Sequence, residues 1–381
     1  MDSKKYNNTK IFFNIAKGIS TFLLILIFVS SGLSFTLQQY LSGYFHNQYV
    51  LLIAFVVVTG VVSSIIFFPV NYYTDFYLEH KYNLSNQTFI KWILEGAKAI
   101  LVSTIIGVPV LLLFFFVLNK YDNLWWLPFA IALFIISVIL ARIVPVIILP
   151  LFYKITPIEN EELKTRIQNL AKNAGIKVEN VYKFNMSKNT KKANAAFTGI
   201  GKSKRILLGD NLIDQYTSDE IETVIAHELG HYKRKHIIKN IIIGTVASFL
   251  TLFLISFFYS YSVTWFNFNS IKEIAALPLL ILWMLLIGLV QTPITNLLSR
   301  KFEYEADQYA ILSTGKPTAF ISTLEKLTEQ NLGDKNPHPL IEWFFYSHPS
   351  IERRILAIRK YSSVLELNNG IIKDNLTYQG E

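Results

Sequence analysis

The number of long apolar stretches limits this 381-residue chain to one class of fold. Six stretches reach the roughly 20 predominantly apolar residues that a helix needs to cross a bilayer. They lie at about 19–37, 49–72, 99–118, 125–148, 240–262 and 275–298. Because hydrocarbon offers no hydrogen-bond partner, a spanning segment must satisfy its own backbone groups, and a helix does so. The sequence therefore predicts a mainly α, polytopic membrane protein with six transmembrane helices.

The composition supports this class. Charged residues make up 17% of the chain, against about a quarter in an ordinary soluble domain. This deficit excludes a disordered chain and argues against a wholly soluble enzyme. The first apolar stretch is expected to be a span and not a signal peptide. Its apolar core, from Phe22 onward, is too long, and no small-residue cleavage site follows it.

The distribution of basic residues predicts the orientation in the membrane. Of the 36 Lys and Arg residues, 33 fall in four segments, while the alternate loops hold only Lys120 and Lys272. The four segments are 1–18, 73–98, 153–239 and 299–381. Cytoplasmic loops carry the excess of Lys and Arg, so both termini are predicted on the cytoplasmic side. This topology explains the net charge of +9, and nucleic acid is not expected as a partner.

The chain is predicted to divide after residue 152. Residues 1–152 form an N-terminal membrane domain with four transmembrane helices. Residues 153–381 form a second domain that includes the other two helices, at about 240–262 and 275–298. The polar regions before and after these two helices are each too small for an independent enzyme, so they are expected to fold together.

The polar regions have an α+β pattern. Apolar spacing predicts a helix over 158–173, and strands are predicted over 178–185 and 204–208 with a turn at 199–202. Thr217 and Glu220 form a capping box at the start of a further predicted helix.

That helix carries His-Glu-Leu-Gly-His at 227–231. Residues four apart lie on one helix face, one turn from each other, so His227 and His231 can bind one metal ion. Glu228 can then accept a proton from a water bound to that ion. The motif predicts one zinc ion per chain, with Glu228 as general base. The alternative is two surface His residues flanking a helical Glu.

The third ligand must be a carboxylate or His, because the chain has no Cys. Glu303 and Asp307 share a predicted helix face with Ala306 and Ala310, whose small side chains allow close packing against the His helix. Glu303 is the predicted ligand, and Asp307 the acceptor that orients a ligand imidazole. Glu305 is expected to point elsewhere, into solvent. The alternative is an acidic amphipathic surface helix.

Gly230 costs its helix about 1 kcal/mol relative to Ala, which predicts a close approach of another backbone or of substrate. His348, before Pro349, has two interpretations. It is a cationic donor for the oxyanion of a tetrahedral intermediate, or an exposed loop residue, and the residues alone favour exposure. His236 and His338 are likewise interpreted as exposed.

At these residues the sequence resembles the type I CAAX prenyl proteases, integral-membrane zinc endopeptidases of the gluzincin class. The resemblance covers about 68–358. The stretches that carry it are 68–88, 149–157, 194–199, 205–208, 227–231 with His236, 299–307 and 346–349.

The resemblance implies the zinc ligands and the base already named. It further implies that Asn194 and Ala195 lie at an edge strand that receives an extended substrate by β-augmentation. It also implies a catalytic role for His348 and a substrate-binding role for Arg354, because both match positions that contact substrate or the oxyanion in the family. The implied fold is a helical barrel around a water-filled chamber, with the zinc site at its cytoplasmic end.

The implied activity is CAAX-type hydrolysis of a peptide or protein substrate with a prenylated C-terminus, among membrane lipids. Eukaryotic members have one more span and a long insertion before the His motif. A bacterial-type member in the plasma membrane is therefore expected.

Two other functions compete. The first is membrane-protein quality control by a zinc protease with unprenylated substrates. A chain with four spans would favour this function, whereas six spans and the match at 68–88 favour the CAAX type. The second is a membrane scaffold or transporter with a structural zinc. Glu228 and the open fourth coordination position argue against it.

Overall fold

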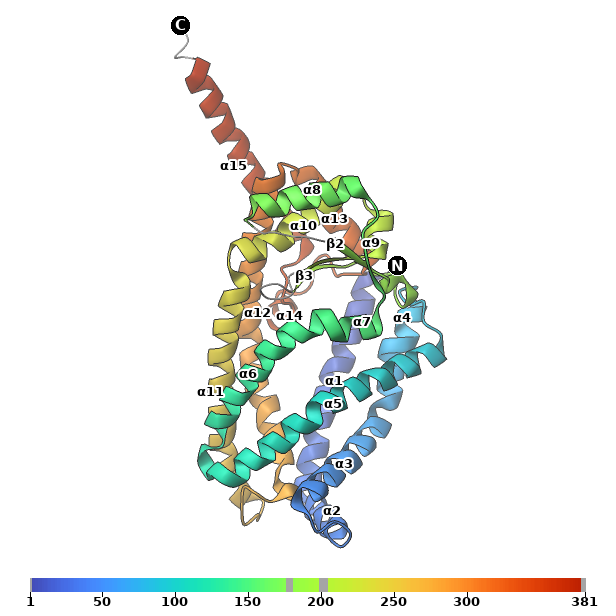
Figure 1. Cartoon of the computed structure of the whole chain (residues 1–381), viewed down its shortest axis with the longest axis vertical. Coiled ribbons are helices and arrows are strands. Elements are labelled where there is room, and N and C mark those ends of the chain that lie inside the picture. Colours follow the sequence, from blue (N-terminus) through green and yellow to red (C-terminus); the bar gives the residue numbers. More distant parts are fainter. Residues whose placement is uncertain (1, 176–180, 199–204, 378–381) are drawn as a thin grey trace. The chain divides into compact units, whose positions relative to one another are not determined.

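The computed structural model describes residues 2–175, 181–198 and 205–377, with side chains to residue 364. The chain forms two compact units (Figure 1). The sheet unit comprises Met1–Asn7, Ala141–Asn240 and Thr292–Glu381. The apolar unit comprises Asn8–Leu140 and Ile241–Gln291.

Within the described ranges, six helical stretches are long and apolar enough to cross a membrane, as predicted. The helices that form them are α1 (Ser3–Ser30), α3 (Gln48–Asn71), α5 (Phe89–Tyr121), α6 (Trp126–Ile143), α11 (His236–Trp265) and α12 (Pro278–Thr314). Shorter helices lie between them: α2 (Leu33–Ser42), α4 (Leu78–Lys81) and α7 (Leu149–Phe152). The protein is therefore a mainly α, multi-pass membrane protein.

The predicted bounds of the first span are wrong. Its helix is Ser3–Ser30 and not 19–37. The chain breaks at Gly32, which has φ +78°, a left-handed conformation that glycine adopts at little cost. The apolar residues that follow belong to α2. The sequence pattern shows apolar length but not this turn.

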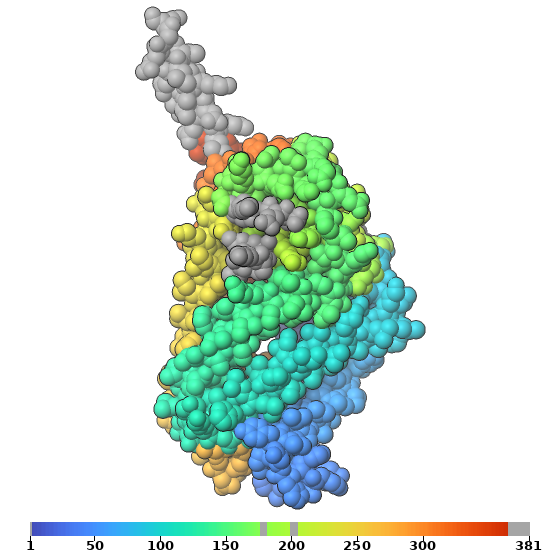
Figure 2. Space-filling view, in the orientation of Figure 1, coloured from blue at the N-terminus to red at the C-terminus, as the bar shows by residue number. Residues whose placement is uncertain are grey.

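The apolar unit has a core of its own. Trp125, Leu52 and Leu118 are almost fully buried in it. Large apolar side chains also cover its outer surface, including Ile100, Leu101 and Ile105 of α5. Figure 2 shows α5 running across the face of this unit that is turned to the viewer. Apolar surface of this extent suits contact with lipid and not with water.

The sheet unit contains one mixed sheet of four strands in the order β1-β2-β4-β3. The strands are β1 (Ile155–Pro157), β2 (Val181–Phe184), β3 (Ala195–Thr198) and β4 (Arg205–Gly209). The strands predicted at 178–185 and 204–208 are present as β2 and β4 over the described residues, while 178–180 and 204 lie outside them. The predicted turn at 199–202 lies outside the described residues. Since β3 pairs only with β4 among the described strands, it is the edge of the sheet.

The predicted helix at 158–173 is α8 (Glu161–Asn173), with Asn160 as its N-cap. Its apolar face is buried, with Leu163, Ile167 and Leu170 in the core of the unit. The remaining helices are α9 (Asp210–Gln215), α10 (Ser218–Lys233), α13 (Pro317–Gln330), α14 (Pro339–Phe345) and α15 (Ile351–Thr377).

Helix α10 is held in the core at its N-terminal end. The Thr217 side chain accepts from the Glu220 amide, and the Glu220 carboxylate accepts from the Thr217 amide, so the predicted capping box is confirmed. Glu220 also accepts from Ser322 and Lys326 of α13. Burial alone would raise the pKa of Glu220, but Lys326, Thr217 and Ser322 lower it below its usual 4.5.

We predict that Glu220→Gln destabilises the chain at neutral pH by about 1.5–3 kcal/mol, the range for hydrogen bonds to a charged group. Because the pKa is lower in the folded state, the carboxylate stabilises the fold above about pH 4.5. That contribution is lost as pH falls through the folded-state pKa, so the difference from wild type should shrink when the pH is lowered well below 4.5. Thermal unfolding in detergent at neutral pH and at the lowered pH measures it, with exposed Glu325→Gln as control. An equal loss at both pH values would contradict the assignment.

Candidate active site

The His-Glu-Leu-Gly-His motif lies in the last turns of α10. His227 and His231 face the same side of the helix, and their Nε2 atoms are 3.2 Å apart. His227 is buried, while His231 and Glu228 are partly exposed. Two imidazoles thus point toward one place, and the carboxylate beside them keeps access to solvent.

Glu303 of α12 completes the group. Its Oε2 lies 3.4 Å from His227 Nε2, and its Oε1 lies 3.3 Å from His231 Nε2. Zinc in a tetrahedral site has bonds of about 2.0–2.1 Å, which separates neighbouring ligand atoms by about 3.3 Å. The two imidazole nitrogens, and each of them with one oxygen of Glu303, therefore lie at separations close to those between neighbouring zinc ligands. They are a group within the described residues that can hold a metal ion.

A buried atom of Glu303 supports this fit. Its Oε2 makes no hydrogen bond of acceptable geometry among the described residues, although His348 Nδ1 lies only 2.9 Å away. A buried carboxylate oxygen without a hydrogen bond is costly unless something else satisfies it. A cation held by Glu303 and the two imidazoles would do so. The structure therefore brings together all three predicted donors, His227, His231 and Glu303.

Gly230 determines how closely α10 and α12 approach. A Cβ atom on Gly230 would lie 3.0 Å from Ala306 Cα and 3.1 Å from Ala306 O. Ala306, at this contact, and Ala310, one turn further along α12, are both buried, as expected from their small side chains. The predicted close approach at Gly230 is confirmed, and the neighbour is the backbone of α12. This contact puts Glu303 within reach of the His pair.

Asp307 lies behind His227. Its Oδ1 is 2.8 Å from His227 Nδ1, on the side of the ring away from Glu303. Arg354 of α15 donates two hydrogen bonds to Asp307, at 2.9 and 2.6 Å. Burial lowers the pKa of His227, but Asp307 and Glu303 outweigh it and raise that pKa to about 10. His227 must release this proton to bind a metal, so binding is favoured as pH rises.

Two residues behind His231 were not predicted. His236, expected to be exposed, is 1% exposed, and its Nδ1 lies 3.0 Å from His231 Nδ1. Its Nε2 lies 2.9 Å from Glu305, which was expected to be free in solvent. The expectation for His236 is wrong, and Glu305 is partly solvated, at 28% exposed, but also bonded to His236, because a turn ends α10 after Lys233 and folds the start of α11 back onto the motif. Lys235, with φ +59°, marks this turn, and the spacing of His residues alone does not reveal it.

His348 and the edge strand complete the surroundings. The His348 side chain is 62% exposed although its Nδ1 lies near Glu303. Asn194 is exposed and immediately precedes β3, which begins at Ala195. The backbone N–H of Phe197 in β3 donates to Glu228 Oε2 at 3.4 Å. The edge strand therefore runs past the carboxylate of the motif.

Comparison with known proteins places this site in a family. The family described as Peptidase family M48 matches residues 157–362. The family described as CAAX prenyl protease N-terminal, five membrane helices, matches residues 1–154. This chain belongs to peptidase family M48. It is a membrane metalloprotease, and its metal-binding group lies within the M48 match.

Similarity to individual proteins supports the family assignment. The chain is 31% identical to the metalloprotease YhfN of Bacillus subtilis, over 96% of this chain and 86% of the relative. It is 32% identical to CAAX prenyl protease 1 of Saccharomyces cerevisiae, over 78% of this chain and 69% of the relative. The crystal structure of S. mikatae Ste24p superposes with a TM-score of 0.84 at 29% identity, covering 93% of this chain and 88% of that one.

The contact at Gly230 gives a prediction. Gly230→Val should push α12 away from α10, with a loss of about 1–3 kcal/mol from overpacking, and should weaken metal binding because Glu303 moves with α12. Metal affinity by competition with a chelator, together with thermal unfolding, measures both effects. Gly244→Val in α11, where a Cβ meets no atom within 4 Å, is the control. Unchanged metal affinity in Gly230→Val would show that the contact does not position Glu303.

Proposed function

We propose that this M48 protein is a zinc-dependent endopeptidase with CAAX-type activity, acting at the membrane on peptide or protein substrates with a prenylated C-terminus. The observation that carries the proposal is the spacing of His227, His231 and Glu303, which matches zinc in a chain that is 32% identical to a named CAAX prenyl protease. The proposed stoichiometry is one zinc ion per chain.

In this proposal each residue of the site has a separate task. His227, His231 and Glu303 hold the ion. When bound, zinc lowers the pKa of a coordinated water to about 7 and polarises the scissile carbonyl. Glu228 adjoins His227 and is partly exposed, so it can accept the proton of the attacking water and pass it to the leaving amine. Asp307 fixes the His227 ring.

His348 and Arg354 are proposed to meet the substrate beside Glu303. His348 is exposed and within 2.9 Å of that ligand, so it can donate to an oxyanion formed there. Arg354 uses Nε and Nη2 to bind Asp307. Its Nη1 lies 3.7 Å from Glu303 Oε2 and is the atom available to a substrate carbonyl.

The edge strand is proposed to align the substrate. Backbone groups of alternate residues in a strand point to the same side. The Phe197 N–H points toward Glu228, away from β4, so the backbone of Ala195 also faces the unpaired edge. An extended peptide paired there, with Asn194 at the start of the strand, would run past Glu228.

The proposed setting is the plasma membrane of a bacterium, with both termini and the metal site on the cytoplasmic side and lipid around the apolar unit. The concentration of Lys and Arg in alternate segments supports the orientation. Quality control of unprenylated membrane proteins is not favoured, because two of the relatives described above are a CAAX prenyl protease and Ste24p.

Proteolysis of a prenylated CAAX peptide by the purified chain tests the proposal. Wild type should cleave it, Glu228→Gln should reduce the rate on the order of 10²–10⁴-fold, and a chelator should abolish cleavage until zinc is restored. Glu222→Gln, on the same helix but paired with Lys316 and not with the motif, is the control. Cleavage that persists in Glu228→Gln would contradict the mechanism. Equal cleavage of the same peptide without its prenyl group would contradict the substrate class.

A further inference from the structure

The two imidazoles of the site are supported in different ways. His227 is backed directly by a carboxylate, Asp307, whose oxygen lies 2.8 Å from Nδ1. His231 is backed by another imidazole, with His236 Nδ1 3.0 Å from His231 Nδ1. Glu305 Oε2 lies 2.9 Å from the far nitrogen of His236. The second chain of contacts thus runs from His231 through His236 to Glu305.

Hydrogen-bond chemistry allows only one arrangement of protons along this chain when His231 binds a metal. Its Nε2 faces His227 and Glu303, so the lone pair of Nε2 is used there and Nδ1 carries the hydrogen. His231 Nδ1 then donates to His236 Nδ1, which must be the acceptor. His236 therefore carries its hydrogen on Nε2 and donates it to Glu305.

The surroundings of His236 hold it in this role. The ring is 1% exposed and stacks on Phe302, with centroids 4.3 Å apart and planes at 12°. Since Phe302 precedes the ligand Glu303 on α12, the same helix turn fixes the stacked ring and the carboxylate. The ring is therefore shielded from water and packed on one face by Phe302.

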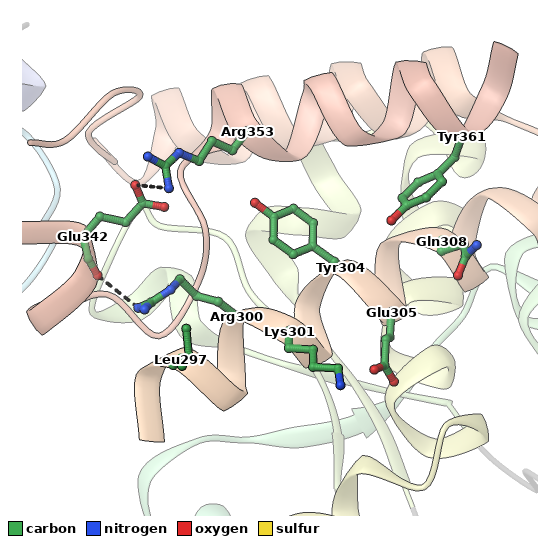
Figure 3. A pocket seen from close by; sticks show the side chains of 9 residues that line it. All are labelled: Leu297, Arg300, Lys301, Tyr304, Glu305, Gln308, Glu342, Arg353 and Tyr361. Atoms are coloured by element: carbon green, nitrogen blue, oxygen red, sulfur yellow. Dashed lines mark hydrogen bonds and ion pairs between the residues drawn. The ribbon is translucent and has the colours of Figure 1, made fainter. Parts of the chain in front are cut away.

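Glu305 ends the chain of contacts at the surface. It lines a cavity of about 400 Å³ together with Lys301 and Gln308 (Figure 3). Its side chain is 28% exposed, and Lys239 lies 3.6 Å from Oε2. A carboxylate oxygen facing His236 Nε2 at 2.9 Å acts as an acceptor, so Glu305 favours the His236 tautomer with hydrogen on Nε2. Loss of Glu305 would leave that choice undetermined.

We infer that His236 and Glu305 are positioning residues for the metal ligand His231, fixing its ring orientation and tautomer as Asp307 does for His227. The inference rests on the proposed metal site. Because the carboxylate acts on His231 only through a neutral imidazole, its support is weaker than that of Asp307 on His227. Removing Asp307 should therefore cost more metal affinity than removing Glu305.

The test measures zinc affinity of the full chain in detergent by competition with a chelator. Partners that orient metal ligands are worth about 10–100-fold in affinity. His236→Phe, which keeps the stacked ring and removes both nitrogens, should lose affinity in this range. Glu305→Ala should lose less than Asp307→Ala. Glu305→Gln should recover much of the loss, because its amide oxygen still accepts from His236.

Two further measurements separate positioning from folding. Gln308→Ala changes the same cavity without touching the His236 contacts, and should leave zinc affinity unchanged. The visible absorption of cobalt bound in place of zinc should change in His236→Phe and Glu305→Ala, and match wild type in Glu305→Gln. A general loss of folding would not produce this pattern of rescue.

The outcomes are distinct. Zinc affinity within twofold of wild type in both His236→Phe and Glu305→Ala, with unchanged cobalt spectra, would overturn the inference alone. An equal loss of zinc affinity in Gln308→Ala and Glu305→Ala would overturn it too, since any change to the cavity would then have the same effect. A wild-type chain that binds no zinc would overturn the proposed function together with this inference.

Discussion

The close approach of α10 and α12 at Gly230 and Ala306 is the contact on which the site depends. One helix supplies both imidazoles and the other supplies Glu303. A side chain at Gly230 would meet the α12 backbone at 3.0 Å, so the distance between the helices is determined there. The cost of a glycine inside a helix is offset by the close packing that brings the three proposed metal ligands together.

Helix α12 then organises the residues around the ligands. One face of α12 carries Glu303 and Asp307. On the same turns, Phe302 stacks on His236 and Glu305 lies within hydrogen-bond distance of it. Arg354, from another helix, neutralises Asp307 behind the site. The buried charges of Asp307 and Arg354 are tolerated because each has an opposite partner. Helix α12 thus carries Glu303 together with the carboxylates that face His227 and His236.

The sequence predicts the parts of the site that follow helix periodicity. The i, i+4 spacing places His227 with His231 and Glu303 with Asp307, and apolar length gives the six spans. It does not predict His236 or Glu305, because their contacts depend on a turn at Lys235 with positive φ. The same limit explains the error in the first span, where Gly32 breaks the helix. Periodicity describes elements, whereas turns determine which elements meet.

The central claim is that one zinc ion is held by His227, His231 and Glu303. Anomalous scattering at the zinc edge from crystals of the zinc-loaded protein tests it most directly. The account predicts one strong peak per chain, about 2.0–2.2 Å from Nε2 of both imidazoles and from a Glu303 oxygen. A peak at another group of residues, or none at this site in zinc-saturated protein, would contradict it.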